Sequence, residues 1–274
     1  MKRPPFRRRK LGRRLRQMRE QAGMTIDEAA LALDKKRTSM YRIEAGESQV
    51  DVHLARSMMD VYDVYLPRLL DDVRYALEPG WWVKYGYTVL GYVDLESEAS
   101  VVREMSLSYV PGLLQTPAYM QAVFEASQLR RTRSEIANQV EIRKIRQLRL
   151  TDEQRPLNLI GLIDESALRR LDRHPELKVE QLESLVIMSD LSTVTLRVLS
   201  EDVGIHGGLT GAFTLLEFPD QEDPDMLYIE YPIGASHFED ASDVARARLV
   251  FEHVVAQAMS HSESVALIEG MLTE

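Results

Sequence analysis

The side chains best suited to chemistry gather in the segment KRTSMYR, which begins at Lys36. Met40 and Ile43 are apolar and lie three residues apart, so they face one side of a helix. Arg37 and Arg42 then point away from that side. The planar fork of arginine matches the acceptors of guanine and of phosphate, and Ser and Thr hydroxyls reach either. The spacing predicts a helix whose exposed face binds nucleic acid.

Two short helices joined by a tight turn are expected to hold these side chains, within the segment MTIDEAALALDKKRTSMYRIEAG (24–46). Thr25 and Glu28 have the spacing of a capping box, in which the hydroxyl accepts a free helix amide and the carboxylate bonds back. Ala29 and Ala30 are small enough to let the helices cross closely. Such a helix-turn-helix unit places its second helix in the major groove of DNA.

A further helix is expected before this unit, because apolar residues recur there on one face and a glycine follows as a stop signal. These residues are Leu11, Leu15, Met18, Ala22 and Gly23.

The charge of the chain is strongly divided. Residues 1–46 hold 14 Lys and Arg against five Asp and Glu, whereas the other residues hold 20 against 38, for a net charge of −9. The basic part attracts phosphate, so nucleic acid is expected there. Residues 1–10, MKRPPFRRRK, contain two prolines and no apolar period. We assign them to a basic N-terminal arm and expect a disordered, solvated tail, with an arm that lies along a minor groove or phosphate strand as the alternative.

Residues 11–77 resemble the lambda-repressor-like (XRE/Cro) helix-turn-helix domains. The match runs through Leu15, Arg19, Gly23, Thr25, Glu28, Ala30, Leu33, Ile43, Glu44 and Gly46. The resemblance implies an all-α fold of five helices and an ion pair between Arg19 and Glu44 that ties the first helix to the recognition helix. Two positions depart from the family pattern, because Ile26 replaces the usual Gln and Asp34 replaces a common Gly. Asp tolerates left-handed backbone angles better than most residues.

DNA contacts are expected from one group of side chains. They are Thr25, Lys36, Arg37, Thr38, Ser39, Tyr41 and Arg42. Because one recognition helix reads only a few base pairs, we expect a homodimer on a two-fold-related operator in double-stranded DNA.

A second domain is expected after Pro79 and Gly80, where a helical pattern ends. The aromatic run WWVKYGY (81–87) favours a packed interdomain linker over 80–94, with a ligand-stacking surface as the alternative. The helix-turn-helix domain is therefore assigned to 11–79, and an effector-binding or partner-binding domain to 95–274.

The second domain is expected to have an α+β fold, a small and mainly antiparallel sheet covered by helices. The expected strands are Leu157–Ile163, Val194–Leu199, Ala212–Phe218 and Met226–Tyr231. The expected helices with bounds are Ala99–Ser108, Pro117–Ala126, Ser134–Leu150, Val179–Leu191 and Ser262–Leu272, and Ile136, Val140 and Leu148 are expected to face inward in the third of these. A long amphipathic helix is also expected before Ser262. Its apolar face comprises Val244, Ala247, Phe251, Val254, Val255 and Ala258.

Several blocks of this domain are similar to the C-terminal domain of actinobacterial helix-turn-helix regulators of the WhiJ-like, antitoxin-like kind. They are YVPGLLQTPAYMQAVF (109–124), Arg146-Gln147, IDESALRRL (163–171), Gln181-Leu182 with Leu185, and YIEYPIGASHFED (228–240). The resemblance implies a small partner protein encoded nearby, and it leaves the ligand of the domain undefined.

An acid/base pair for catalysis would have to come from Asp164, Glu165, Glu230 and His206. No phosphate loop, zinc-protease motif or nucleophile elbow accompanies them, and Asp164 suits the N-cap of a helix over Glu165–Leu171. The chain has no cysteine, and its six histidines lack metal-ligand spacing. We therefore expect no enzymatic activity, no cofactor and no metal.

Two charged stretches leave alternatives open. Residues 217–243 contain nine Asp and Glu and no Lys or Arg, which suits solvated loops or a docking face for a basic partner or the basic head. A basic stretch suits a solvated helix face, a second phosphate contact or a partner interface. It comprises Arg130, Arg131, Arg133, Arg143, Lys144, Arg146 and Arg149.

No apolar run approaches the roughly 18 residues of a membrane span, and no apolar signal region begins the chain, so a cytoplasmic protein without a membrane partner is expected. The patterns together indicate a transcriptional regulator whose acidic domain binds a partner protein or effector. The alternatives are an antitoxin-like protein with autoregulatory DNA binding and a small-molecule sensor whose pocket the aromatic run lines.

Overall fold

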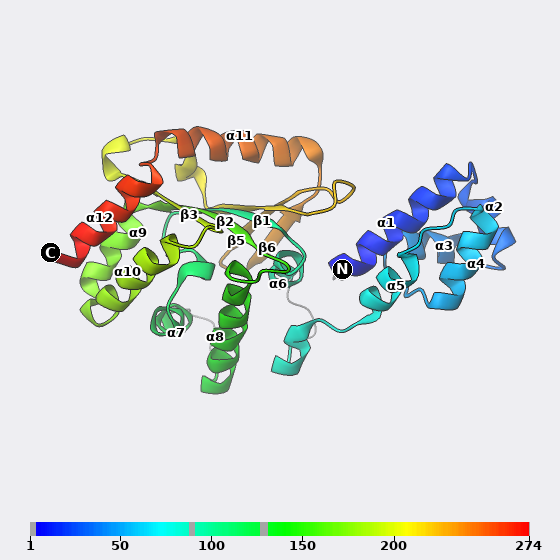
Figure 1. Ribbon diagram of the computed structural model, residues 1–274, viewed down its shortest axis with the longest axis horizontal. Helices are drawn as coiled ribbons and strands as arrows, with labels where there is room; N and C mark the ends of the chain where they lie inside the picture. Colours follow the sequence, from blue (N-terminus) through cyan, green and yellow to red (C-terminus); the bar gives the residue numbers. More distant parts are fainter. Residues whose placement is uncertain (1–3, 88–90, 127–130, 274) are drawn as a thin grey trace. The chain divides into compact units, whose positions relative to one another are not determined.

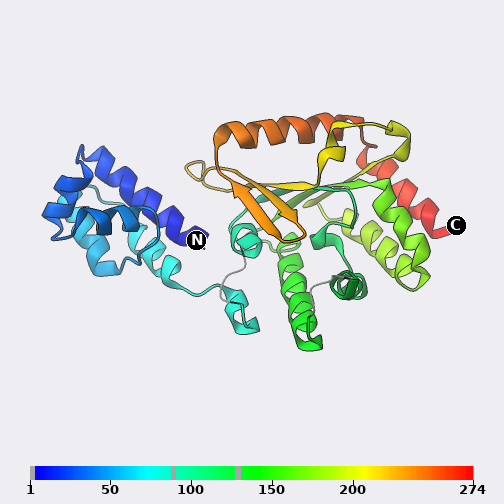
Figure 2. The same cartoon turned by 180° about the vertical axis from the view of Figure 1, so that it is seen from behind.

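The chain folds into two units that differ in their secondary structure, one helical and one built around a sheet (Figures 1 and 2). The computed structural model describes residues 4–87, 91–126 and 131–273. The first unit comprises Met1–Glu98 and the second Ala99–Glu274. Residues 80–87 and 91–94 of the expected linker therefore belong to the first unit, and residues 88–90 lie outside the described part.

The first unit has the five helices that the resemblance implies, followed by two short ones. They are α1 (Phe6–Gln21), α2 (Ile26–Ala32), α3 (Arg37–Glu44), α4 (Val52–Tyr62), α5 (Leu69–Leu77), the 3-10 helix η1 (Trp81–Tyr85) and α6 (Gly91–Glu96). Their apolar faces meet in one core, in which Leu15, Met18, Ala29, Met40 and Met58 are at most 2% exposed. The expected inward faces of α1, α2 and α3 are confirmed.

The expectation of a disordered arm over residues 1–10 is wrong for residues 6–10, because α1 begins at Phe6. The Phe6 ring is 1% exposed, and its amide donates to Oδ2 of Asp94 at 2.7 Å. The guanidinium groups of Arg9 and Arg13 lie 5.5 and 5.6 Å from the centroid of that ring. A buried aromatic side chain and a partner for the first amide therefore extend the helix beyond Leu11. Residues 1–3 lie outside the described part.

The second unit is built on a six-stranded mixed sheet in the order β3-β2-β1-β4-β5-β6. The strands are β1 (Val101–Ser106), β2 (Asn158–Asp164), β3 (Val194–Leu199), β4 (Phe213–Glu217), β5 (Met226–Tyr231) and β6 (Gly234–Phe238). The β1–β2 and β2–β3 pairs are parallel, and the other three are antiparallel. The expected α+β fold with a mainly antiparallel sheet is confirmed.

Helices cover both faces of this sheet, with α11 on one face and α7, α8 and α10 on the other (Figures 1 and 2). The α-helices are α7 (Pro117–Ala126), α8 (Arg133–Gln147), α9 (Glu165–Arg169), α10 (Pro175–Ser189), α11 (Ala241–Gln257) and α12 (His261–Thr273). The 3-10 helices are η2 (Gly112–Leu114), η3 (Leu148–Leu150), η4 (Arg170–Arg173), η5 (Glu201–Val203) and η6 (Gly207–Thr210). Phe251 and Val254 of α11 are buried in one cluster with Met105, Leu162 and Leu215 of the sheet.

Two local expectations for this unit are wrong, and one strand was not expected. The segment Ala99–Ser108, expected as a helix, contains β1, a strand that pairs with β2 on one side and β4 on the other. Strand β6 was not expected, because GASHF has a single large apolar side chain, Phe238, and the strand pairs with β5 through a hairpin. Leu148, expected to face inward, is 64% exposed because it follows the last turn of α8, whereas Ile142 is buried.

Candidate nucleic-acid interface

The helix-turn-helix unit is set by local hydrogen bonds around α2. The Thr25 hydroxyl accepts the Glu28 amide at 3.3 Å, and Oε2 of Glu28 accepts the Thr25 amide at 2.8 Å, which completes the capping box. The amide and hydroxyl of Thr25 lower the pKa of the Glu28 carboxyl. In the turn, Asp34 adopts a φ of 50°, the left-handed conformation that its side chain tolerates. Helix α3 begins at Arg37, three residues later.

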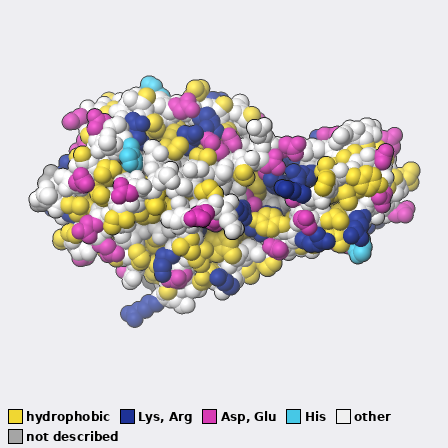
Figure 3. Space-filling view, in the orientation of Figure 1, with side chains coloured by type: hydrophobic (Ala, Val, Ile, Leu, Met, Phe, Trp, Pro, Cys, Tyr) yellow, Lys and Arg dark blue, Asp and Glu magenta, His cyan; other side chains and the backbone are white. Residues whose placement is uncertain are grey.

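The outer face of α3 is polar, and its inner face is held by two buried side chains. Met40 is 0% and Ile43 4% exposed in the core. Thr25, Lys36, Arg37, Thr38, Tyr41 and Arg42 are exposed, and Ser39 is half-buried. The residues expected to contact DNA are thus all at least partly exposed, at the start of α2 and along α3. Figure 3 shows Lys and Arg side chains on the visible face of the first unit, among acidic and hydrophobic ones.

An ion pair joins α1 to the end of α3. Nε of Arg19 lies 2.6 Å from Oε1 of Glu44, and Nη2 lies 2.9 Å from Oε2, so the contact is bidentate. Nη1 of Arg19 also donates to the carbonyl oxygen of Met24 at 2.8 Å. The two side chains are 9% and 7% exposed, and the hydrogen bond to Glu44 raises the pKa of Arg19. This is the ion pair that the resemblance implies.

Both arginines on the outer face of α3 have a carboxylate neighbour. Nη1 of Arg37 lies 2.6 Å from Oδ2 of Asp27, and Nε of Arg42 lies 3.5 Å from Oε2 of Glu47. Sequence reasoning did not single out Asp27 or Glu47. Asp27 lies ten positions before Arg37, so only the turn between α2 and α3 brings the two side chains together.

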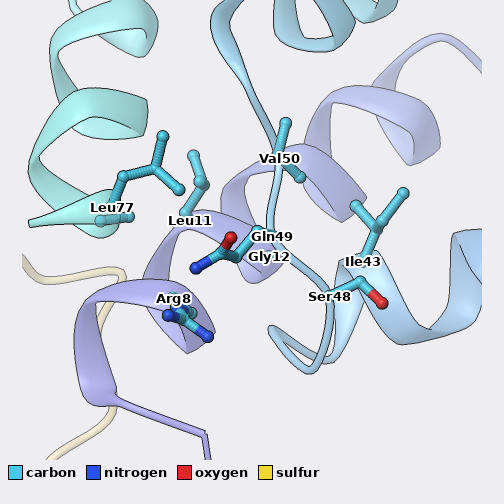
Figure 4. Close-up of a pocket in the computed structure, with 9 residues that line it drawn as sticks. Arg8, Leu11, Gly12, Ile43, Ser48, Gln49, Val50 and Leu77 are labelled. Atoms are coloured by element: carbon cyan, nitrogen blue, oxygen red, sulfur yellow. The ribbon is translucent and has the colours of Figure 1, made fainter.

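Two cavities lie within this helical unit. The smaller, about 10 Å³, has room for about one water molecule and lies where α1 meets the end of α3 (Figure 4). It is lined by Arg8, Leu11, Gly12, Ile43, Ser48, Gln49, Val50, Ala76 and Leu77. The larger, about 160 Å³, is lined by Arg7, Lys10, Leu11, Arg14, Asp72, Tyr75 and Glu98. It is smaller than the roughly 300 Å³ of a small ligand pocket.

The aromatic run contributes side chains to packing. Trp82 is 6% exposed, and its ring meets that of Trp81 edge to face, with centroids 5.7 Å apart. Nε1 of Trp81 donates to Oγ of Ser97 at 3.2 Å. Neither cavity described above is lined by these rings.

In the second unit, the structure brings together three of the four residues considered for acid/base chemistry. Asp164 caps α9 through the Ser166 amide at 3.0 Å, and Nε2 of His206 lies 3.8 Å from its other oxygen. Nδ1 of His206 accepts the Gly208 amide at 3.2 Å. Glu230 does not join them, because β5 is separated from β2 by β1 and β4.

The carboxylate of Glu165, next to Asp164, is engaged in hydrogen bonds within the fold. Burial raises the pKa of its carboxyl, but hydrogen bonds from the Glu201 amide and from Arg169 outweigh that effect and hold the pKa below its usual value. Oε2 accepts the Glu201 amide at 3.2 Å, and Oε1 accepts Nη2 of Arg169 at 2.9 Å. Among residues 4–87, 91–126 and 131–273, no group of three or more His, Cys, Asp or Glu is arranged to hold a metal ion.

Three of the motif blocks of the second unit meet around the loop that contains η2: residues 109–124, the block with Gln147 and the block with Gln181. Oε1 of Gln181 accepts the Thr116 amide, and its Nε2 donates to the Leu114 carbonyl, both at 2.8 Å. Nε2 of Gln147 donates to the carbonyls of Leu113 and Gln115 at 3.1 and 2.8 Å. Gln147 of α8 and Gln181 of α10 therefore satisfy backbone groups of this loop.

Several carboxylates of the acidic stretch 217–243 are used inside the fold. Glu217 accepts hydrogen bonds from Arg103 at 2.7 Å and Arg248 at 2.5 Å, and Asp225 accepts one from Arg248 at 2.8 Å. Asp240 caps α11. Glu222 and Glu230 are exposed. The stretch is therefore partly structural.

The basic stretch around α8 also makes local contacts. The guanidinium of Arg143 lies 4.7 Å from the centroid of the Phe124 ring, and Lys144 pairs with Glu141 at 2.8 Å. Arg149 donates to the Ala99 carbonyl. Arg130 lies outside the described residues.

In the part of the chain that the structure describes, no helix is long and apolar enough to cross a membrane.

Comparison with known families divides the chain as the fold does. Residues 10–72 match the model of a helix-turn-helix domain, and residues 89–270 match that of a domain of unknown function (DUF5753). No curated protein and no solved structure matches the chain. The helix-turn-helix domain supports a DNA-binding regulator. Because the second match spans more than half of the sequence, the protein belongs to the DUF5753 family.

Proposed function

We propose that this protein is a transcriptional regulator that binds one operator sequence as a homodimer, with α3 of each copy in the major groove. The observation that carries the proposal is the polar outer face of α3, whose inner face is packed in the core and whose end is tied to α1 by Arg19 and Glu44. A rigidly held helix with exposed arginines suits base recognition.

The surface offers two kinds of DNA contact. Lys36, Thr38 and the start of α2 at Thr25 suit phosphates, which position the protein, whereas Arg37 and Arg42 suit base edges. Ile26 stands at a position where a polar side chain would add a further contact. Pairing two copies doubles the number of base pairs read and supplies the specificity that one helix lacks.

Fluorescence anisotropy with the purified full-length protein tests this function. The protein is titrated against its own upstream DNA and a scrambled duplex at several salt concentrations. We expect tighter binding to the upstream DNA, with a salt slope of about −0.9 per phosphate contact. Arg42→Ala should weaken specific binding, whereas Arg74→Ala, which alters an exposed arginine of α5, should not. Weak and equal binding to both duplexes would contradict the proposal.

For the second unit we propose binding rather than catalysis: it docks a small partner protein encoded nearby, as in WhiJ-like, antitoxin-like regulators, without a cofactor. The commitment of Asp164 and Glu165 to the fold supports this. So do two apolar side chains at loop tips, Ile205 and Ile233, which are 95% and 94% exposed. The protein would bind both DNA and its partner protein in the cytoplasm.

Co-expression with the products of adjacent genes tests the second unit. Relief of a toxic effect, together with a complex that survives gel filtration, would favour an antitoxin-like protein in which DNA binding is autoregulatory. Ile233→Ser should weaken such a complex, and Glu222→Gln, at another exposed position, should leave it unchanged. Absence of any complex with adjacent products would contradict this role.

A further inference from the structure

We infer that Asp27 is a positioning residue for base recognition: its carboxylate holds the Arg37 guanidinium at the start of α3 so that the arginine reads a guanine. The inference rests on the proposed DNA-binding function and adds to it a residue and a base. Asp27 lies in the first turn of α2, and Arg37 is the first residue of α3.

The geometry of the pair leaves one edge of the Arg37 guanidinium available for a contact with a base. The bond joins Nη1 of Arg37 to Oδ2 of Asp27 at 2.6 Å. The guanidinium is planar and carries its donors in a fixed fork. With Nη1 engaged, Nε and Nη2 form a separate edge with two parallel donors. That edge matches the N7 and O6 acceptors of guanine in the major groove.

Stability does not account for this ion pair. The side chains of Arg37 and Asp27 are 69% and 60% exposed, and ion pairs that exposed contribute little to folding. The cap of α2 does not need Asp27 either, because Thr25 and Glu28 complete the capping box between themselves. The effect of the pair that remains is to fix the position of the Arg37 guanidinium.

A carboxylate on this surface also acts against indiscriminate binding. Lys36, just before α3, and Arg42, in its last turn, are also exposed, and such cations attract any phosphate backbone. The negative charge of Asp27 opposes that attraction on every DNA sequence. At the correct base the oriented arginine gains a bidentate contact, so the difference between right and wrong sequences grows.

Asp27→Asn tests the inference against a matched control. Asp71→Asn is the control, because Asp71 forms an equally short pair with Arg74, at 2.6 Å, on the exposed surface of α5. Anisotropy is measured on the operator and on duplexes with each position substituted in turn. We expect D27N to lower the preference for guanine at one position by about tenfold and to tighten binding to scrambled DNA. D71N should match the wild type.

Two further variants separate positioning from a general effect. Arg37→Ala should remove the preference at the same position as D27N, and adding D27N to R37A should change that preference no further. Asp27→Glu should restore part of it. The melting temperature of D27N should equal that of the wild type.

The outcomes distinguish the inference from the proposed function. A specific wild-type protein whose base preferences D27N leaves unchanged, or changes at a position other than that of R37A, would overturn the inference alone. A wild-type protein that prefers no duplex would overturn the proposed function and this inference with it.

Discussion

Gly12 of α1 lies directly against the carbonyl oxygen of Glu44, the last residue of α3: a Cβ at Gly12 would stand 2.5 Å from that oxygen. Gly46 makes the reciprocal approach, because a Cβ there would stand 2.7 Å from the amide nitrogen of Arg9. Gly46 also has a φ of 73°, which favours glycine. Helix α1 and the end of α3 therefore touch at the level of their backbones, and the Arg19–Glu44 ion pair lies at the same junction.

Gly12→Ala should destabilise the first unit by about 1–3 kcal/mol, because the backbones must separate to admit a methyl group. Thermal unfolding of the full-length protein measures the loss. Gly91→Ala is the control in the same unit, since a Cβ there would meet nothing within 4 Å. Equal melting temperatures for the two variants would contradict the close contact.

Arg19→Ala should destabilise the first unit more strongly, by about 3–5 kcal/mol, because the Glu44 carboxylate would stay buried without its partner. Arg42→Ala, at an exposed position, should change the melting temperature little while weakening operator binding. Chemical denaturation of both variants tests the contrast. Similar losses of stability would mean that the two faces of α3 are wrongly assigned.

Gln181→Leu should destabilise the second unit. Gln181 is 0% exposed, and the change would strand the Thr116 amide and the Leu114 carbonyl, at about 1–3 kcal/mol for each unsatisfied group. Gln154→Leu, at an exposed position of a loop, serves as the control. If Q181L were about as stable as the control, the loop containing η2 would not depend on the hydrogen bonds of Gln181.

The second unit should lose stability in acid through Glu217. Burial raises the pKa of this carboxyl, but hydrogen bonds from Arg103 and Arg248 outweigh burial and lower it below the ordinary value of 4.5. A carboxyl whose pKa is lower in the folded state stabilises the fold above its unfolded pKa and loses that effect as the pH falls through the folded pKa.

Melting temperatures of wild type and Glu217→Gln between pH 7 and pH 3 test this dependence. The variant should be less stable at pH 7, and the difference should shrink as the pH falls below about 4.5. Glu222→Gln, at an exposed position, should follow the wild type throughout. A constant difference between wild type and E217Q would rule out the ionised carboxylate as its source.

Elements whose causes are local follow from the sequence alone. The capping box of Thr25 and Glu28 lies within one turn, and the spacing of Met40 and Ile43 sets the inner face of α3 within another. Strands β3 and β5 occupy the ranges expected from their short apolar segments, because each carries its own buried side chains.

Other features depend on contacts between residues far apart in the chain, which form only in the folded protein. Helix-forming residues such as Arg103 and Glu104 lie in β1 because β2 and β4 supply hydrogen-bond partners on both sides. Phe6 extends α1 because α6 provides Asp94. Asp27 meets Arg37 only across the turn. Periodicity in the sequence shows which side of an element is buried. It does not show which neighbouring element covers that side or which partner each polar group bonds, because these contacts form only when the chain folds.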